Sequence, residues 1–77
     1  MWTILGPIRK RKVIARGREI EILDYLQEQY GGRNWRKLKG FARIEDEHGW
    51  IGIAEIHWFE AHGVGRVAFK IKRRFLA

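Results

Sequence analysis

The residues best suited to chemistry lie close together in the second half of the chain. His57 follows Glu55 by two positions, so in a strand both side chains point to the same face. An imidazole beside a carboxylate, set among fixed cations, suits general acid–base catalysis on a phosphodiester. The alternative is structural, because charged pairs on strand surfaces commonly stabilise sheets. The sequence therefore offers a proton-transfer pair or an ordinary surface pair.

Cations of the following strand extend this predicted site. Lys70 faces His57 if the last hairpin turns around Gly63, and Lys72 and Arg66 belong to the same strand. Such cations stabilise the negative charge that develops on a phosphate. His62, in the turn that follows the strand of His57, is the candidate for a second proton shuttle. The predicted catalytic residues are His57, Glu55, His62, Arg66 and Lys70.

No cofactor or metal is expected from the residue types and their spacing. The chain has no cysteine, which excludes a disulfide scaffold, a thiolate zinc site and a cysteine nucleophile. His57 and His62 are five positions apart across a strand end, with no second carboxylate cluster, which is not a metal-ligand spacing. The segment 63–65 precedes a strand, whereas a phosphate-binding loop precedes a helix.

The distribution of charge indicates a polyanion as the partner. The net charge is +7 on 77 residues, as expected of a nucleic-acid binder. Segment 18–30 carries a net −3, so the other residues together carry +10, concentrated in 9–12, 33–43 and 64–77. The alternative is a soluble protein that is merely basic. The predicted nucleic-acid contacts are Lys37, Lys39, Arg43, Lys70, Lys72, Arg73 and Arg74, with Trp35 and Trp50 either stacking on bases or filling the core.

Hydrophobic periodicity predicts one helix followed by antiparallel strands. Apolar residues at spacings of three and four form one stripe over 18–30, and two glycines then supply a helix stop. From residue 34 onward the period changes to two. Strands are predicted over 35–45, 50–59 and 65–75, with a first strand over 8–15. The short turns between the later strands imply an antiparallel meander.

These elements predict an α+β fold. One amphipathic helix would pack on a three- to four-stranded antiparallel sheet, and residues 1–77 would form a single domain. A single helix can cover only one face. We expect it on the face of Ala54, Ile56, Trp58, Val67, Phe69 and Ile71. The open face would then carry Lys37, Lys39, Arg43, Glu55, His57, Lys70 and Lys72.

Two segments resemble a known group of small ribonucleases. The runs WRKLKGFARIE (35–45) and AEIHWFEAHGVGRVAFKIKRRF (54–75) are similar to the carboxy-terminal domains of bacterial polymorphic toxins and their stand-alone relatives. The order of elements over about 19–75 resembles the barnase–EndoU–colicin–RelE superfamily. This resemblance implies metal-independent cleavage of RNA by the 2′-hydroxyl, and an acidic antitoxin or immunity protein as partner. It points to Glu55, His57, Arg66, Lys70 and Lys72 as site residues.

The sequence thus supports an RNA-binding protein with toxin-like endoribonuclease activity. The alternative is a non-catalytic nucleic-acid-binding module that uses the same basic face, and a third hypothesis is an adaptor for an acidic protein. The apolar runs are too short to cross a membrane, and the apolar segment 1–8 is too short for a secretory signal. We therefore expect a cytoplasmic protein, or the released tip of a larger secreted one, with no membrane partner.

Overall fold

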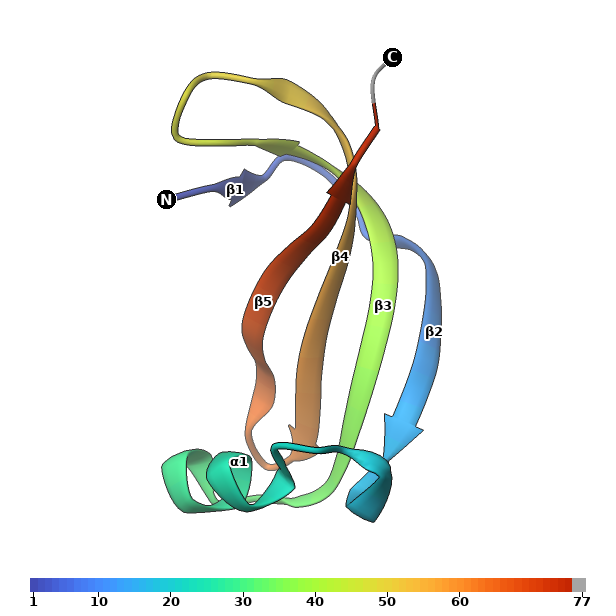
Figure 1. Cartoon of the computed structure of the whole chain (residues 1–77), viewed down its shortest axis with the longest axis vertical. Helices are drawn as coiled ribbons and strands as arrows, with labels where there is room; N and C mark the ends of the chain where they lie inside the picture. The colour runs from blue at the N-terminus through green and yellow to red at the C-terminus, as the bar shows by residue number, and fades with distance from the viewer. Residues whose placement is uncertain (76–77) are drawn as a thin grey trace.

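The computed structural model describes residues 1–75 and shows an α+β fold in which one short helix meets a curled antiparallel sheet (Figure 1). The elements are β1 (Thr3–Ile4), β2 (Arg9–Arg16), the 3-10 turn η1 (Gly17–Glu19), α1 (Leu23–Tyr30), β3 (Arg33–Glu45), β4 (Ile51–His62) and β5 (Gly65–Arg74). Strands β3, β4 and β5 pair in sequence order, which confirms the meander. Both β1 and β2 pair with the other edge of β3.

The helical region is shorter than the periodicity predicted. The η1 turn is closed by the Glu19 carboxylate, which accepts a hydrogen bond from the backbone N–H of Arg16 at 2.9 Å. Ile20 then adopts an extended backbone and is buried, so the chain leaves the helical path before α1 begins. The predicted stop is confirmed: Gly31 has a φ of 69°, and its N–H bonds to the carbonyl of Gln27.

The helix covers the face of the sheet opposite to the one predicted. Leu26 and Ile20 pack on Trp35, Phe59 and Ala61. In β4, Phe59 and Ala61 alternate with Trp58, so they lie on the side of the sheet that carries His57. The expectation that the helix covers Ala54, Ile56 and Trp58 is therefore wrong.

The face around Trp58 forms a separate core at the other end of the sheet. Its buried residues come from β3 and β4, and the amino-terminal segment packs against them through Trp2, Ile4 and Ile8. Along β4 the buried side changes between Trp58 and Phe59, which are both buried. Strand twist allows a strand of 12 residues to face one core at one end and the opposite core at the other.

A bulge in β5 separates residues that a regular alternation would place together. The β4–β5 register shifts between His57 and Phe59, and Ala68 has a φ of 57°. Val67 therefore packs in the helix-side core, whereas the ring of Phe69 stacks on Trp58 with centroids 5.5 Å apart. The predicted grouping of Val67 with Phe69 and Ile71 is wrong because one extra residue reverses the alternation.

Gly40 provides the space in which the amino-terminal segment meets the sheet. A Cβ at this position would lie 2.5 Å from Cγ2 of Ile8 and 3.2 Å from the ring of Trp58. We expect Gly40→Ala to lower the free energy of unfolding by about 1–3 kcal/mol, the usual cost of overpacking a core. Urea unfolding of both proteins measures the change. Gly6→Ala is the matched control, because a Cβ at Gly6 would meet no heavy atom within 4 Å; equal losses in the two variants would contradict the packing argument.

Candidate nucleic-acid interface

Four polar side chains face one another in a line across the sheet. Lys12 of β2 is paired with Lys39 of β3, Lys39 with His57 of β4, and His57 with Lys70 of β5. Directly opposed residues in antiparallel strands point to the same face. We call these four residues the cationic row. Lys12 and Lys39 are like charges placed opposite each other, which destabilises a sheet, so this part of the row carries an electrostatic cost that an anionic ligand would remove.

Protection of the sheet edges explains only part of this charge. Strands β2 and β5 are the outer strands of the sheet, and lysines on outer strands discourage pairing with other chains. That explanation covers Lys12 and Lys70. It does not cover Lys39 and Lys37, which lie half-buried on the inner strand β3. Lys37 instead lies over the ring of Phe59, with its Nζ 5.8 Å from the ring centroid, so edge protection leaves Lys39 without an explanation.

Glu55 and His57 form a hydrogen-bonded pair beside the row. Nε2 of His57 lies 2.7 Å from Oε2 of Glu55, and the two side chains are 13% and 16% exposed. An ionised carboxylate can only accept, so Nε2–H donates. This hydrogen bond lowers the pKa of Glu55 against the opposing effect of burial, and the charges of His57, Lys39 and Arg73 lower it further. The carboxylate is thus held ionised within the basic face.

The remaining nitrogen of His57 limits what the pair can do. Nδ1 is buried and has no hydrogen-bond partner among the described residues. In the neutral imidazole with a proton on Nε2, Nδ1 is the basic atom. A ligand hydroxyl would reach it only after the surrounding side chains move. In this conformation, the pair is better placed to set the charge of the face than to exchange protons.

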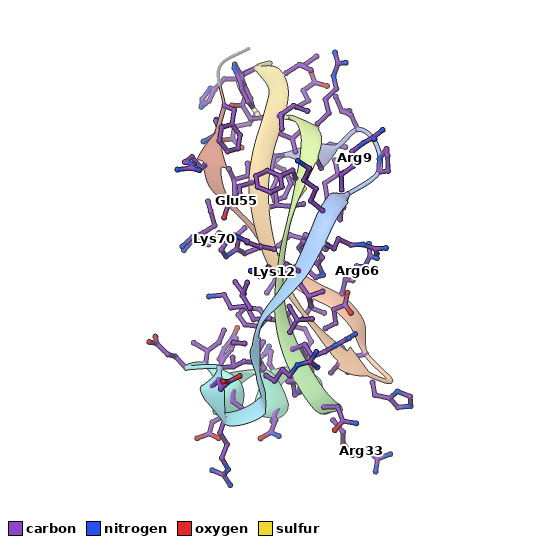
Figure 2. The ribbon with its side chains drawn as sticks, turned by 90° about the vertical axis from the view of Figure 1, so that its right-hand side faces the viewer. Arg9, Lys12, Arg33, Glu55, Arg66 and Lys70 are labelled. Atoms are coloured by element: carbon purple, nitrogen blue, oxygen red, sulfur yellow. The ribbon has the colours of Figure 1, made fainter. Side chains whose placement is uncertain are left out.

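The row borders a hollow between the sheet and the segment that precedes α1. This hollow has a volume of about 430 Å³, and its basic lining consists of Lys37, His57, Lys70 and Lys72. Its opposite wall is formed by residues 19–22, so the carboxylates of Glu19 and Glu21 also line the hollow. Figure 2 shows Glu55 and Lys70 on the side of the sheet where α1 lies. The predicted pairing of Lys70 with His57 is confirmed.

His62 and Arg66 do not join this group. Arg66 lies on the opposite side of the sheet (Figure 2), where its Nε is 3.4 Å from Oε2 of Glu60. Glu60 also binds Arg36, with Nη2 and Oε1 2.6 Å apart. His62 is exposed at the end of β4 and lines a separate cavity with these three residues. The sheet therefore divides the predicted catalytic set, leaving His57, Glu55 and Lys70 together.

Trp35 and Trp50, predicted either to stack on bases or to fill the core, differ in burial. Trp35 is 2% exposed, and its Nε1 donates a hydrogen bond to the carbonyl of Gly31 at 3.0 Å. It is a core residue, which is the second of the two alternatives that the sequence left open. Trp50 is half-buried with its ring lying over Gly52. The guanidinium carbon of Arg74 also lies near this indole, 5.9 Å from the centroid of the Trp50 ring.

The other predicted contacts extend along the strands beyond the row. Arg43 is exposed on β3. Nη2 of Arg73 lies 3.9 Å from Oε1 of Glu55. Nε of Arg74 lies 3.5 Å from Oδ2 of Asp46. Sequence reasoning left Lys12 out of the site, although the run 9–12 was a visible signal. Only the register of β2 against β3 places Lys12 opposite Lys39.

No group of three His, Asp or Glu side chains among residues 1–75 could hold a metal ion. No helix in the same range is long and apolar enough to cross a membrane.

Comparison of the chain with protein-family models, curated proteins and solved structures gave no match. The resemblance to small ribonucleases therefore stays a prediction. The function is argued from the geometry of the basic face.

The pKa of Glu55 gives a prediction for stability against pH. Because this pKa is lowered on folding, Glu55 stabilises the protein fully above the ordinary glutamate pKa of about 4.3. The contribution is lost as the pH falls through the lowered pKa. Urea unfolding between pH 7 and pH 3 should show a larger loss of stability for the wild type than for Glu55→Gln. Parallel curves for the two proteins would contradict the assignment.

Proposed function

We propose that this chain binds nucleic acid through the cationic row. The observation that carries the proposal is the register that sets Lys12, Lys39, His57 and Lys70 opposite one another on four strands. Within residues 1–75 the three lysines form no ion pair shorter than 4.0 Å. Their charges are therefore available to a ligand.

The shape of the row suits a phosphate backbone that crosses the strands. Neighbouring strands lie about 4.8 Å apart, so four strands place the row over roughly 15 Å. Phosphates lying along this line would neutralise the like charges that oppose one another across the strands. RNA is the first ligand to test, because the sequence resemblance implies it. An acidic inhibitor protein, implied by the same resemblance, would compete with RNA for these lysines.

Salt dependence tests the binding proposal. Each phosphate neutralised on a single strand contributes about −0.7 to the slope of log K against log salt. Lys39→Gln and Lys12→Gln should each reduce the magnitude of this slope by about 0.7, measured by fluorescence anisotropy with a labelled RNA. Arg18→Gln removes an exposed cation from η1, outside the row, and is the control. Equal slopes for all four proteins would count against the row as the binding site.

A second function, cleavage of RNA, is favoured by the Glu55–His57 pair. After an opening of the face, Nδ1 of His57 would take the proton of a 2′-hydroxyl while Glu55 holds the imidazole. The 2′-oxygen would then form a bond to phosphorus as the bond to the 5′-oxygen breaks, and solvent would protonate the leaving oxygen. Lys70, opposite His57, would stabilise the charge on the phosphate. Since Nδ1 is buried, the geometry supports binding better than cleavage.

A cleavage assay in EDTA distinguishes the two functions. If the pair is catalytic, the protein should cut RNA and leave 2′,3′-cyclic phosphate and 5′-hydroxyl ends. His57→Ala should then lose cleavage even at protein concentrations that, by gel shift on the same substrate, saturate the RNA. RNA that stays intact at protein concentrations above the dissociation constant would leave binding as the function.

A further inference from the structure

Beyond the cationic row, toward the β3–β4 turn, the protein has an apolar hollow of about 430 Å³. Leu5, Phe41 and Ile53 supply its apolar lining, and the cations Arg9, Lys10 and Arg43 also line it. We call this hollow the apolar slot. None of the described residues that line it is acidic.

Large apolar side chains are left uncovered in the slot. Leu5 is 44% exposed and Ile53 is 46% exposed. Helix α1 packs in the core around Phe59, which lies on the other side of the row from Phe41. An exposed apolar surface bordered by charges is a common mark of a binding site.

An aromatic surface continues from the slot along the same end of the sheet. The ring of Phe75 lies 5.9 Å from that of Phe41, centroid to centroid, and the guanidinium carbon of Arg73 lies 5.0 Å from the centroid of Phe75. Phe41 follows Lys39 of the row by two residues, which places the two side chains on one face about 7 Å apart. That separation is comparable with one nucleotide step of an extended strand.

We infer that the apolar slot holds an unpaired base of single-stranded nucleic acid, while the adjoining phosphates contact Arg9, Arg43 and the cationic row. This inference rests on the proposed function and adds a preference for single strands, because only an unpaired base can leave its stack to enter the slot. Charge complementarity favours a polyanion here. Two copies of the chain meeting slot to slot would bring their cations together, so a nucleic acid suits the slot better than a second copy does.

Substitution of slot residues separates base recognition from charge. Ile53→Ser removes an exposed slot residue, and Ile51→Ser is the matched control, since Ile51 is 47% exposed on the same strand but outside the slot. Phe41→Ala is the second slot variant. The probes are a 12-nucleotide single-stranded RNA, its blunt duplex and inorganic polyphosphate, which has charge but no bases. Thermal unfolding of each variant checks that it is folded.

The expected result is a loss confined to single strands. Ile53→Ser and Phe41→Ala should bind the single-stranded RNA at least about fivefold more weakly, as for the loss of one stacked base, and should bind polyphosphate as the wild type does. Ile51→Ser should match the wild type with all three probes. If the slot variants keep full affinity for the single-stranded RNA, the slot does not bind a base, and the proposal that the cationic row binds nucleic acid is unaffected.

Two further outcomes would also overturn the inference. If the wild-type protein binds neither RNA nor polyphosphate, both the proposed nucleic-acid binding by the row and the base binding by the slot are wrong. A wild-type dimer that Ile53→Ser converts to a monomer in light scattering, without RNA, would show that a second copy occupies the slot.

Discussion

The long antiparallel pairing of β3 with β4 holds both cores and the cationic row in place. The two strands keep one register from Arg36–Glu60 to Glu45–Ile51, with the only shift near the start of β3. So long a ladder must twist. The twist turns one face toward the amino-terminal segment at one end and the opposite face toward α1 at the other. Residues 1–75 thereby form two small cores with one α-helix.

The position of the cationic row follows from this arrangement. His57 and Lys39 lie between the helix-side core at Phe59 and the apolar slot at Phe41. At this level a hollow of about 430 Å³ separates the sheet from residues 19–22, so the charged side chains are not packed into an apolar core. Their aliphatic stems are half-buried against neighbouring strands, as the exposure of Lys37 and Lys39 shows. The sheet can thus carry a line of cations across its middle.

Glu55 moderates the repulsion within the row in the absence of a ligand. Its carboxylate hydrogen-bonds to His57, lies 3.9 Å from Arg73 and feels the charge of Lys39. This one carboxylate does not neutralise the three lysines of the row, and those lysines form no ion pair within the described residues. On the far side of the sheet, Glu60 is surrounded by Arg36, Arg66 and the indole of Trp58, which donates at 3.1 Å. That carboxylate anchors two arginines and leaves them less available.

The α+β class, the strands of the meander, the helix stop at Gly31 and the pairing of Lys70 with His57 could be predicted from the residues alone, because they depend on local periodicity, glycine conformation and a short hairpin.

Contacts between distant segments set which face α1 covers and bury Trp35. The same contacts bring Lys12 into the row and separate His62 and Arg66 from His57. A period of two says which residues alternate, but it does not say where a twisting strand changes its buried side. Nor does it reveal the extra residue at Ala68, whose φ of 57° reverses the alternation of β5.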